Sequence, residues 1–122
     1  MDRSFRSDLP IYTQLVDRIK QDIVSGLLPP GEKLNSVRDL AAESGVNPNT
    51  MQRALQELER DGLLYTQRTS GRFVTEDTGV IRRCKELLAK QQIETFLAAM
   101  TQLGYDNPDI LRLLENEKEE EA

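Results

Sequence analysis

The sequence predicts a mainly α-helical fold that carries one small β-hairpin. Between residues 34 and 74, two short helical patterns are separated by a glycine-centred turn, and a short basic hairpin pattern follows them. A longer helical pattern precedes this stretch, and a pair of helical patterns follows it. This order is typical of a winged helix-turn-helix followed by a C-terminal two-helix segment.

The first two helices are expected from about Pro10 to Ser25 and from Ser36 to about Ser44. Pro10 has a fixed φ that suits the first helical turn, and Ser36 is a favoured N-cap residue. A glycine follows each helix and is placed to end it. The apolar residues that recur at helical spacing, and that we expect in the core, are Ile11, Leu15, Val16, Ile19, Ile23, Val37, Leu40 and Ala41.

The third helix has clear signals at both ends. Asn47 is a favoured N-cap residue, Pro48 suits the first helical position, and Gly62 is placed to end the helix. Its apolar face is expected to consist of Met51, Ala54, Leu55 and Leu58. The opposite face carries amides and an arginine in its N-terminal half, whereas the acids gather at the C-terminal end. Because the helix dipole favours acids at the start, this order is unusual for a surface that serves solubility alone, and it suits an approach to phosphate.

Two short strands are expected at residues 63–67 and 72–75, joined by a turn in which Gly71 permits tight geometry. A two-stranded hairpin is marginal by itself in water, so this one must pack against the helices. A helical pattern then runs from about residue 79 to 103. Asn107 and the proline after it repeat the cap-and-proline start for a last helix.

These elements define three regions. Residues 9–77 form the expected winged helix-turn-helix domain, with the helix-turn-helix at about 37–56 and the wing at 63–75. Residues 78–118 form a C-terminal helical region, and residues 119–122 are a solvated acidic tail.

Composition argues against most enzyme classes. The 122 residues include no histidine and a single cysteine, which removes the usual general base, the commonest metal ligand and any intramolecular disulfide. We therefore expect no catalytic site, no metal and no cofactor. No apolar run approaches the roughly 20 residues that cross a bilayer, and the N-terminus lacks the apolar core of a signal peptide. These features predict a reduced, cytoplasmic protein with no membrane partner.

The net charge of −5 does not exclude nucleic acid, because phosphate responds to a local field that is screened within about 8 to 10 Å. Residues 1–77 carry 10 Lys and Arg against 12 Asp and Glu, and residues 78–122 carry 6 against 9. Within residues 66–75, however, Arg68 and Arg72 stand with no acid. The wing is therefore expected to be locally basic.

The third helix supplies the expected base readers. Asn and Gln match the adenine edge in the major groove and Arg matches guanine, so Asn49, Gln52 and Arg53 are the best candidates. The alternative is that these three residues only form the solvent-exposed face of the helix. Thr50, near the helix start, is expected to meet a phosphate, whereas Asn47 is more a structural cap than a base reader.

The other expected DNA contacts are to the phosphate backbone, where they would orient the protein on the duplex. Arg38 projects from the second helix, and its alternative is an ordinary surface charge paired with Asp39 or Glu43. The tyrosine near the start of the first helix offers a hydroxyl to phosphate or packs against Pro10. Arg68 contacts phosphate or nothing. The full set of expected DNA-binding residues is Tyr12, Lys33, Ser36, Arg38, Asn47, Pro48, Asn49, Thr50, Gln52, Arg53, Arg68, Gly71 and Arg72.

Residues between about 9 and 76 match a known family pattern. They are Pro10, Ile11, Tyr12, Gln14, Gly26, Leu27, Leu28, Pro29, Pro30, Gly31, Leu34, Ser36, Arg38, Leu40, Ala41, Gly45, Val46, Thr50, Leu58, Gly62, Leu63, Gly71, Phe73 and Val74. In these residues the chain resembles the GntR family of bacterial transcription regulators. The resemblance implies a winged helix-turn-helix that binds operator DNA as a homodimer, usually to repress. The family's DNA-contacting positions correspond to Arg38, Asn47 to Thr50, Arg53 or Gln52, and Gly71.

Two departures refine this resemblance. Asn35 stands where many members have proline, and Pro48 stands where many have an arginine that reads bases, so that role is not carried over. Residues 46–50 and the short C-terminal part resemble the YtrA-type branch, in which the C-terminal helices dimerise the protein and transporter operons are often controlled. The residues expected to dimerise are Ile81, Cys84, Leu88, Ile93, Leu97 and Met100. Cys84 is expected to be a small buried hydrophobe, the alternative being a redox sensor with an exposed, low-pKa thiol.

Together these patterns predict a homodimeric, sequence-specific repressor that binds a partly palindromic, double-stranded operator. The helix at 48–61 and the wing at 68–72 are the expected binding elements. One alternative is a winged-helix module for protein–protein contact. Another is a regulator gated by a small molecule at the dimer interface, of a kind that the sequence does not identify.

Overall fold

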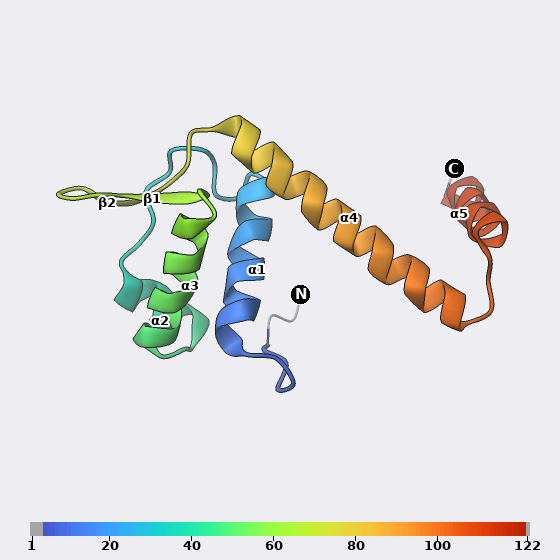
Figure 1. The fold of residues 1–122 in the computed structure, drawn as a ribbon, viewed down its shortest axis with the longest axis horizontal. Coiled ribbons are helices and arrows are strands. Elements are labelled where there is room, and N and C mark those ends of the chain that lie inside the picture. The colour runs from blue at the N-terminus through green and yellow to red at the C-terminus, as the bar shows by residue number, and fades with distance from the viewer. Residues whose placement is uncertain (1–3, 122) are drawn as a thin grey trace. The chain divides into compact units, whose positions relative to one another are not determined.

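The structure, a computed structural model, describes residues 4–121. Its elements in chain order are α1 (Ile11–Val24), α2 (Val37–Ser44), α3 (Pro48–Arg60), β1 (Leu64–Gln67), β2 (Gly71–Val74), α4 (Thr78–Gln102) and α5 (Asn107–Glu121) (Figure 1). The expected mainly α-helical fold with one small hairpin is confirmed. The contacts divide the chain into two compact units, one ending at Lys85 and the other beginning at Glu86, so the long helix α4 belongs to both.

The first unit is built on α3, which packs against both α1 and α2. All four residues of the expected apolar face of α3 are at most 2% exposed. The rest of its buried core consists of Leu15, Val16, Ile23, Leu34, Ala41, Leu63, Leu64 and Val74. The expectation that Ile11 belongs to this core is wrong, because it lies in the first turn of α1 and is 44% exposed.

The ends of α2 and α3 follow from single residues. The Ser36 hydroxyl accepts a hydrogen bond from the Asp39 amide at 3.1 Å, and the Asn47 side chain accepts one from the Asn49 amide at 2.7 Å, as expected for N-caps. Gly45 ends α2 with a φ of 68°, a left-handed conformation that glycine adopts without strain. This glycine lets the chain turn from α2 into α3 within three residues.

Two expected helix starts are corrected. Pro10 is the N-cap of α1, with a ψ of 138°, and is not its first helical residue. Helix α5 is capped by Asp106 and not by Asn107. The Asp109 amide donates to the Asp106 carboxylate at 2.9 Å, and the Asp106 amide donates back to the Asp109 carboxylate at 3.1 Å. This reciprocal pair satisfies two amides of the first turn, whereas Asn107 alone would satisfy one.

The hairpin is antiparallel, with Leu64 opposite Val74 and Gln67 opposite Gly71. It is steadied by the segment before α2 as well as by α3. The Leu34 amide donates to the Arg72 carbonyl at 2.9 Å, and the Val74 amide donates to the Glu32 carbonyl at 2.9 Å. These bonds add a third run of backbone to the hairpin, which explains how two such short strands are held.

The second unit contains the C-terminal part of α4 and helix α5. Its Ile110 is buried, but much of its apolar surface is not. The large exposed apolar side chains in this unit are Leu87, Ile93, Phe96, Leu103, Tyr105, Leu111, Leu113 and Leu114. No helix within residues 4–121 combines the length and the apolar character that a membrane crossing needs.

Candidate nucleic-acid interface

The N-terminal half of α3 presents the expected base readers to solvent. Asn49 and Arg53 are exposed, and Gln52 is half-buried. The first turn of α3 contains no acid. Its amides and its arginine therefore face outward without a carboxylate beside them, the arrangement that a phosphate-lined groove requires.

Arg53 lies against Tyr12 of α1. The guanidinium carbon of Arg53 stands 3.7 Å from the centre of the Tyr12 ring, a cation–π contact. The sequence placed both residues in the candidate interface but did not predict that they touch, because they come from different helices. From sequence, Pro10 was the packing partner considered for the Tyr12 ring, whereas the structure places Arg53 against it.

The start of α1 is held by a residue to which the sequence assigned no role. The Gln14 side chain donates to the Arg6 carbonyl at 2.8 Å and to the Leu9 carbonyl at 3.0 Å, and it accepts from the Arg6 amide at 2.8 Å. These three bonds fold the preceding segment onto α1. The available signal was the presence of Gln14 in the family pattern beside Pro10 and Tyr12.

A groove of about 660 Å³ separates the N-terminus of α2 from the hairpin. It gathers four residues expected to contact DNA: Lys33, Ser36, Gly71 and Arg72. Arg38 is exposed, and no ion pair within the described part of the chain includes it. The considered pairing of Arg38 with Asp39 or Glu43 is therefore absent there, and Glu43 instead accepts a hydrogen bond from Asn35 at 3.1 Å.

The hairpin carries its two arginines differently. Arg68 is exposed in the turn between the strands. Arg72 lies in β2, where its Nε donates to the Glu59 carboxylate of α3 at 2.8 Å and only 16% of its side chain is exposed. The Thr66 hydroxyl donates to the same carboxylate oxygen. The structure thus places Arg72 in a bridge between the hairpin and α3, and not at the tip of the wing.

Glu59 was not among the residues singled out from sequence. Burial pushes its pKa up, but hydrogen bonds from Arg72 and Thr66 and the nearby positive charge outweigh burial and hold the pKa of Glu59 below its ordinary value. The carboxylate therefore stays ionised and keeps the bridge charged. Its partner lies 13 residues further along the chain, so only the register of the hairpin reveals the pair.

Gly71 opens β2 with a φ of 114°, where other residues are strained. A β-carbon at this position would lie 3.0 Å from the Cε atom of Lys33. The glycine therefore lets the Lys33 side chain lie against the end of the hairpin, which joins two residues of the expected interface.

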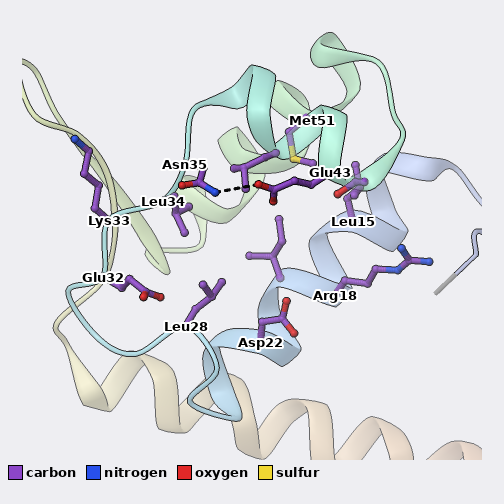
Figure 2. A pocket seen from close by; sticks show the side chains of 13 residues that line it. Leu15, Arg18, Asp22, Leu28, Glu32, Lys33, Leu34, Asn35, Glu43 and Met51 are labelled. Atoms are coloured by element: carbon purple, nitrogen blue, oxygen red, sulfur yellow. Dashed lines mark hydrogen bonds between the residues drawn. The ribbon is translucent and has the colours of Figure 1, made fainter. Parts of the chain in front are cut away.

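A second cavity, of about 490 Å³, lies between α1, the connecting segment and α2 (Figure 2). Its lining combines apolar side chains, among them Leu15, Leu34 and Met51, with polar ones, and a hydrogen bond joins two of the polar ones, Asn35 and Glu43. Lys33 lines both this cavity and the groove beside the hairpin. Within residues 4–121, no cluster of three or more metal-binding side chains occurs.

The residues expected to dimerise fall in two groups. Ile81 and Cys84 pack against the core of the first unit, so they already have partners within the chain. Burial raises the pKa of the Cys84 thiol, and the nearby Asp61 adds to this effect while Lys20 opposes it. A raised pKa suits the interpretation of Cys84 as a small hydrophobe. The other four are exposed or half-buried on α4: Leu88, Ile93, Leu97 and Met100.

Relatives match the chain over most of its length. Residues 11–74 match the family described as bacterial regulatory proteins, gntR family. The HTH-type transcriptional regulator YhcF of Bacillus subtilis (strain 168) is 40% identical over 111 residues, 91% of this chain and 92% of that protein. The HTH-type transcriptional repressor YtrA of the same strain is 37% identical over 93 residues, 75% of this chain and 72% of that protein.

Solved structures share the fold. A GntR family transcriptional regulator from Listeria monocytogenes matches with a TM-score of 0.84 and 40% identity, over 92% of this chain and 98% of that one. AraR(DBD) in complex with operator ORR3 matches with a TM-score of 0.53 and 31% identity, over 62% of this chain and 88% of that one. The second match shows that a related domain binds operator DNA.

Proposed function

The chain belongs to the GntR family of bacterial regulatory proteins and is a DNA-binding transcription regulator, and from this premise we propose that it represses transcription as a homodimer on a partly palindromic operator. The observation that carries the proposal is the exposed, acid-free N-terminal half of α3. A relative named as a repressor, YtrA, supports the sign of regulation. The resemblance to its branch favours a transporter operon as the target.

In this proposal α3 enters the major groove, where Asn49, Gln52 and Arg53 read base edges. Thr50 and Arg38 meet phosphates beside the helix. Lys33, Ser36, Arg68 and Gly71 line or border the path of the phosphate backbone past the hairpin. The protein acts in the reducing cytoplasm, where its DNA is found.

Selection of bound sequences from a random DNA pool tests the proposal. We expect a motif of two inverted half-sites whose centres lie about one helical turn, roughly 34 Å, apart. The affinity should fall steeply with salt, by about 0.9 log units per log unit of salt for each phosphate neutralised. An unselective, salt-insensitive interaction would favour the alternative of a protein–protein contact module.

The proposed dimer rests on the second unit. Ile93 is 57% exposed and Phe96 is 41% exposed. A second copy of the chain would bury this apolar surface. In the full-length chain, Ile93→Glu with Phe96→Glu should shift the protein to monomer in sedimentation. Gln91→Glu with Ala98→Glu, which adds the same number of acids at exposed positions on the opposite side of α4, is the matched control and should leave the dimer intact. A dimer that survives Ile93→Glu with Phe96→Glu would place the interface elsewhere.

A second candidate function is gating by a small molecule. The cavity in Figure 2 favours it, because Lys33 and Asn35 in its wall belong to the segment that leads into α2. A small molecule in that cavity would contact the segment before α2, which also includes Lys33 of the candidate DNA interface. A thermal-shift screen followed by operator titration tests this candidate, and a compound that stabilises the protein without changing its operator affinity would count against it.

A further inference from the structure

We propose that Tyr12 is a positioning residue for Arg53. In the free protein, the Tyr12 ring holds the Arg53 guanidinium in the orientation in which it reads a base. This inference rests on the proposed function and names a specificity-determining partner within the same site. The observation that carries it is the stacking of the Arg53 guanidinium at 3.7 Å from the centre of the Tyr12 ring.

Tyr12 stands on a rigid base. It lies in the first turn of α1, two residues before Gln14, whose side chain holds the N-terminal segment. The next turn is anchored by the buried Leu15 and Val16. The ring itself is half-buried, whereas Arg53 is exposed. The ring therefore has a fixed place, and the arginine is the mobile member of the pair.

Stacking leaves the guanidinium free to read a base. The five N–H donors of arginine lie in the plane of the guanidinium, whereas an aromatic ring covers only one face of that plane. A carboxylate partner would occupy those donors instead. No ion pair or side-chain hydrogen bond of Arg53 occurs within residues 4–121. The in-plane edge that matches guanine O6 and N7 is therefore unoccupied in the free protein.

Pre-ordering changes the affinity because a long arginine side chain loses rotamer freedom when it binds. A chain already held over a ring loses less of that freedom on meeting its base. An exposed cation–π contact favours the stacked arrangement by about two- to fivefold. We expect removal of the ring to weaken operator binding by a similar factor, and only when Arg53 is present.

A double-mutant cycle in the full-length protein tests this coupling on the operator that the wild type selects. Tyr12→Leu should weaken binding about two- to fivefold more than Tyr12→Phe does, and in the Arg53→Ala background the two substitutions should have the same effect. Tyr12→Phe keeps the ring, so any loss it causes should be equal with and without Arg53. In operator variants, Tyr12→Leu should flatten the preference at the same base pair as Arg53→Ala.

A measurement without DNA checks the geometry and the fold. In NMR spectra, the Arg53 side-chain protons should show ring-current shifts in the wild type and in Tyr12→Phe, and should lose them in Tyr12→Leu, while all three proteins keep a cooperative thermal unfolding transition. Tighter operator binding by Tyr12→Leu would overturn the proposal, because the ring would then be a latch that withholds Arg53. Equal losses in both Arg53 backgrounds would also overturn it. Failure of the proposed function looks different: wild-type protein would then select no DNA sequence at all.

Discussion

Arg53 in the N-terminal half of α3 and Arg72 in the hairpin have opposite kinds of partner. Arg53 rests on the Tyr12 ring, which leaves its hydrogen-bond donors open. Arg72 gives its Nε donor to Glu59 at 2.8 Å and is largely covered. The same residue type is thus available for recognition in one region and committed to structure in the other.

This difference indicates a division of labour within the first unit. Glu59 stands near the C-terminal end of α3, so its bridge to Arg72 fixes the hairpin relative to the helix that carries the proposed base readers. In the proposed function, the hairpin contributes to DNA binding mainly through its position, and exposed Arg68 and Gly71 are its candidate DNA contacts. Charge counting along the sequence treats Arg68 and Arg72 alike and does not separate these roles.

The largest expected effect tests the recognition side. Arg53→Ala should weaken binding to the selected operator by about 1 to 3 kcal/mol and should affect random DNA much less, because a base contact is lost. Anisotropy titrations on both DNAs measure the difference. Arg60→Ala, at the other end of α3, is the matched control and should change neither affinity appreciably, since Arg60 pairs with Glu57 at the surface. Equal losses on both DNAs would make Arg53 a phosphate contact.

The next effect tests the contribution of the hairpin backbone at Gly71. Gly71→Ala should destabilise the first unit by about 1 to 2 kcal/mol, because a side chain at a φ of 114° is strained. Urea unfolding measures it. Gly79→Ala is a contrasting glycine, since Gly79 lies in α4 without a positive φ. The operator motif should stay unchanged while affinities for all DNAs fall together. A changed motif would mean that the hairpin reads sequence.

A smaller effect tests the bridge directly. Glu59→Gln keeps the shape of the side chain but removes its charge, and it should lower the free energy of unfolding by about 1 kcal/mol, as expected for a charge-assisted hydrogen bond. Glu57→Gln removes the exposed pair with Arg60 and should cost about 0.5 kcal/mol or less. If the two substitutions cost the same, the bridge is no more than another surface ion pair.

The sequence predicted the parts of this site that depend on neighbours along the chain. The Asn47 cap, the proline after it and the buried face of α3 follow from local hydrogen bonding and helical spacing. The contacts of Arg53 with Tyr12 and of Arg72 with Glu59 did not follow, because each joins two elements whose relative position is set by the core. Local rules therefore supplied the candidate site residues, which remain predictions, and packing decides which partner each arginine has.

The pH dependence of the bridge is the smallest effect and the sharpest test of its electrostatic origin. Because the folded pKa of Glu59 is lowered, its ionisation stabilises the folded state fully above the unfolded pKa, about 4.3, and this stabilisation is lost as the pH falls through the folded value. The free energies of unfolding of the wild type and Glu59→Gln should therefore differ above pH 5 and converge at lower pH. Other carboxylates are common to both proteins and cancel in the difference. In an Arg72→Gln background, which lacks the guanidinium, the gap should show little pH dependence. A gap that is constant with pH in the wild-type background would mean that shape, and not charge, holds the hairpin to α3.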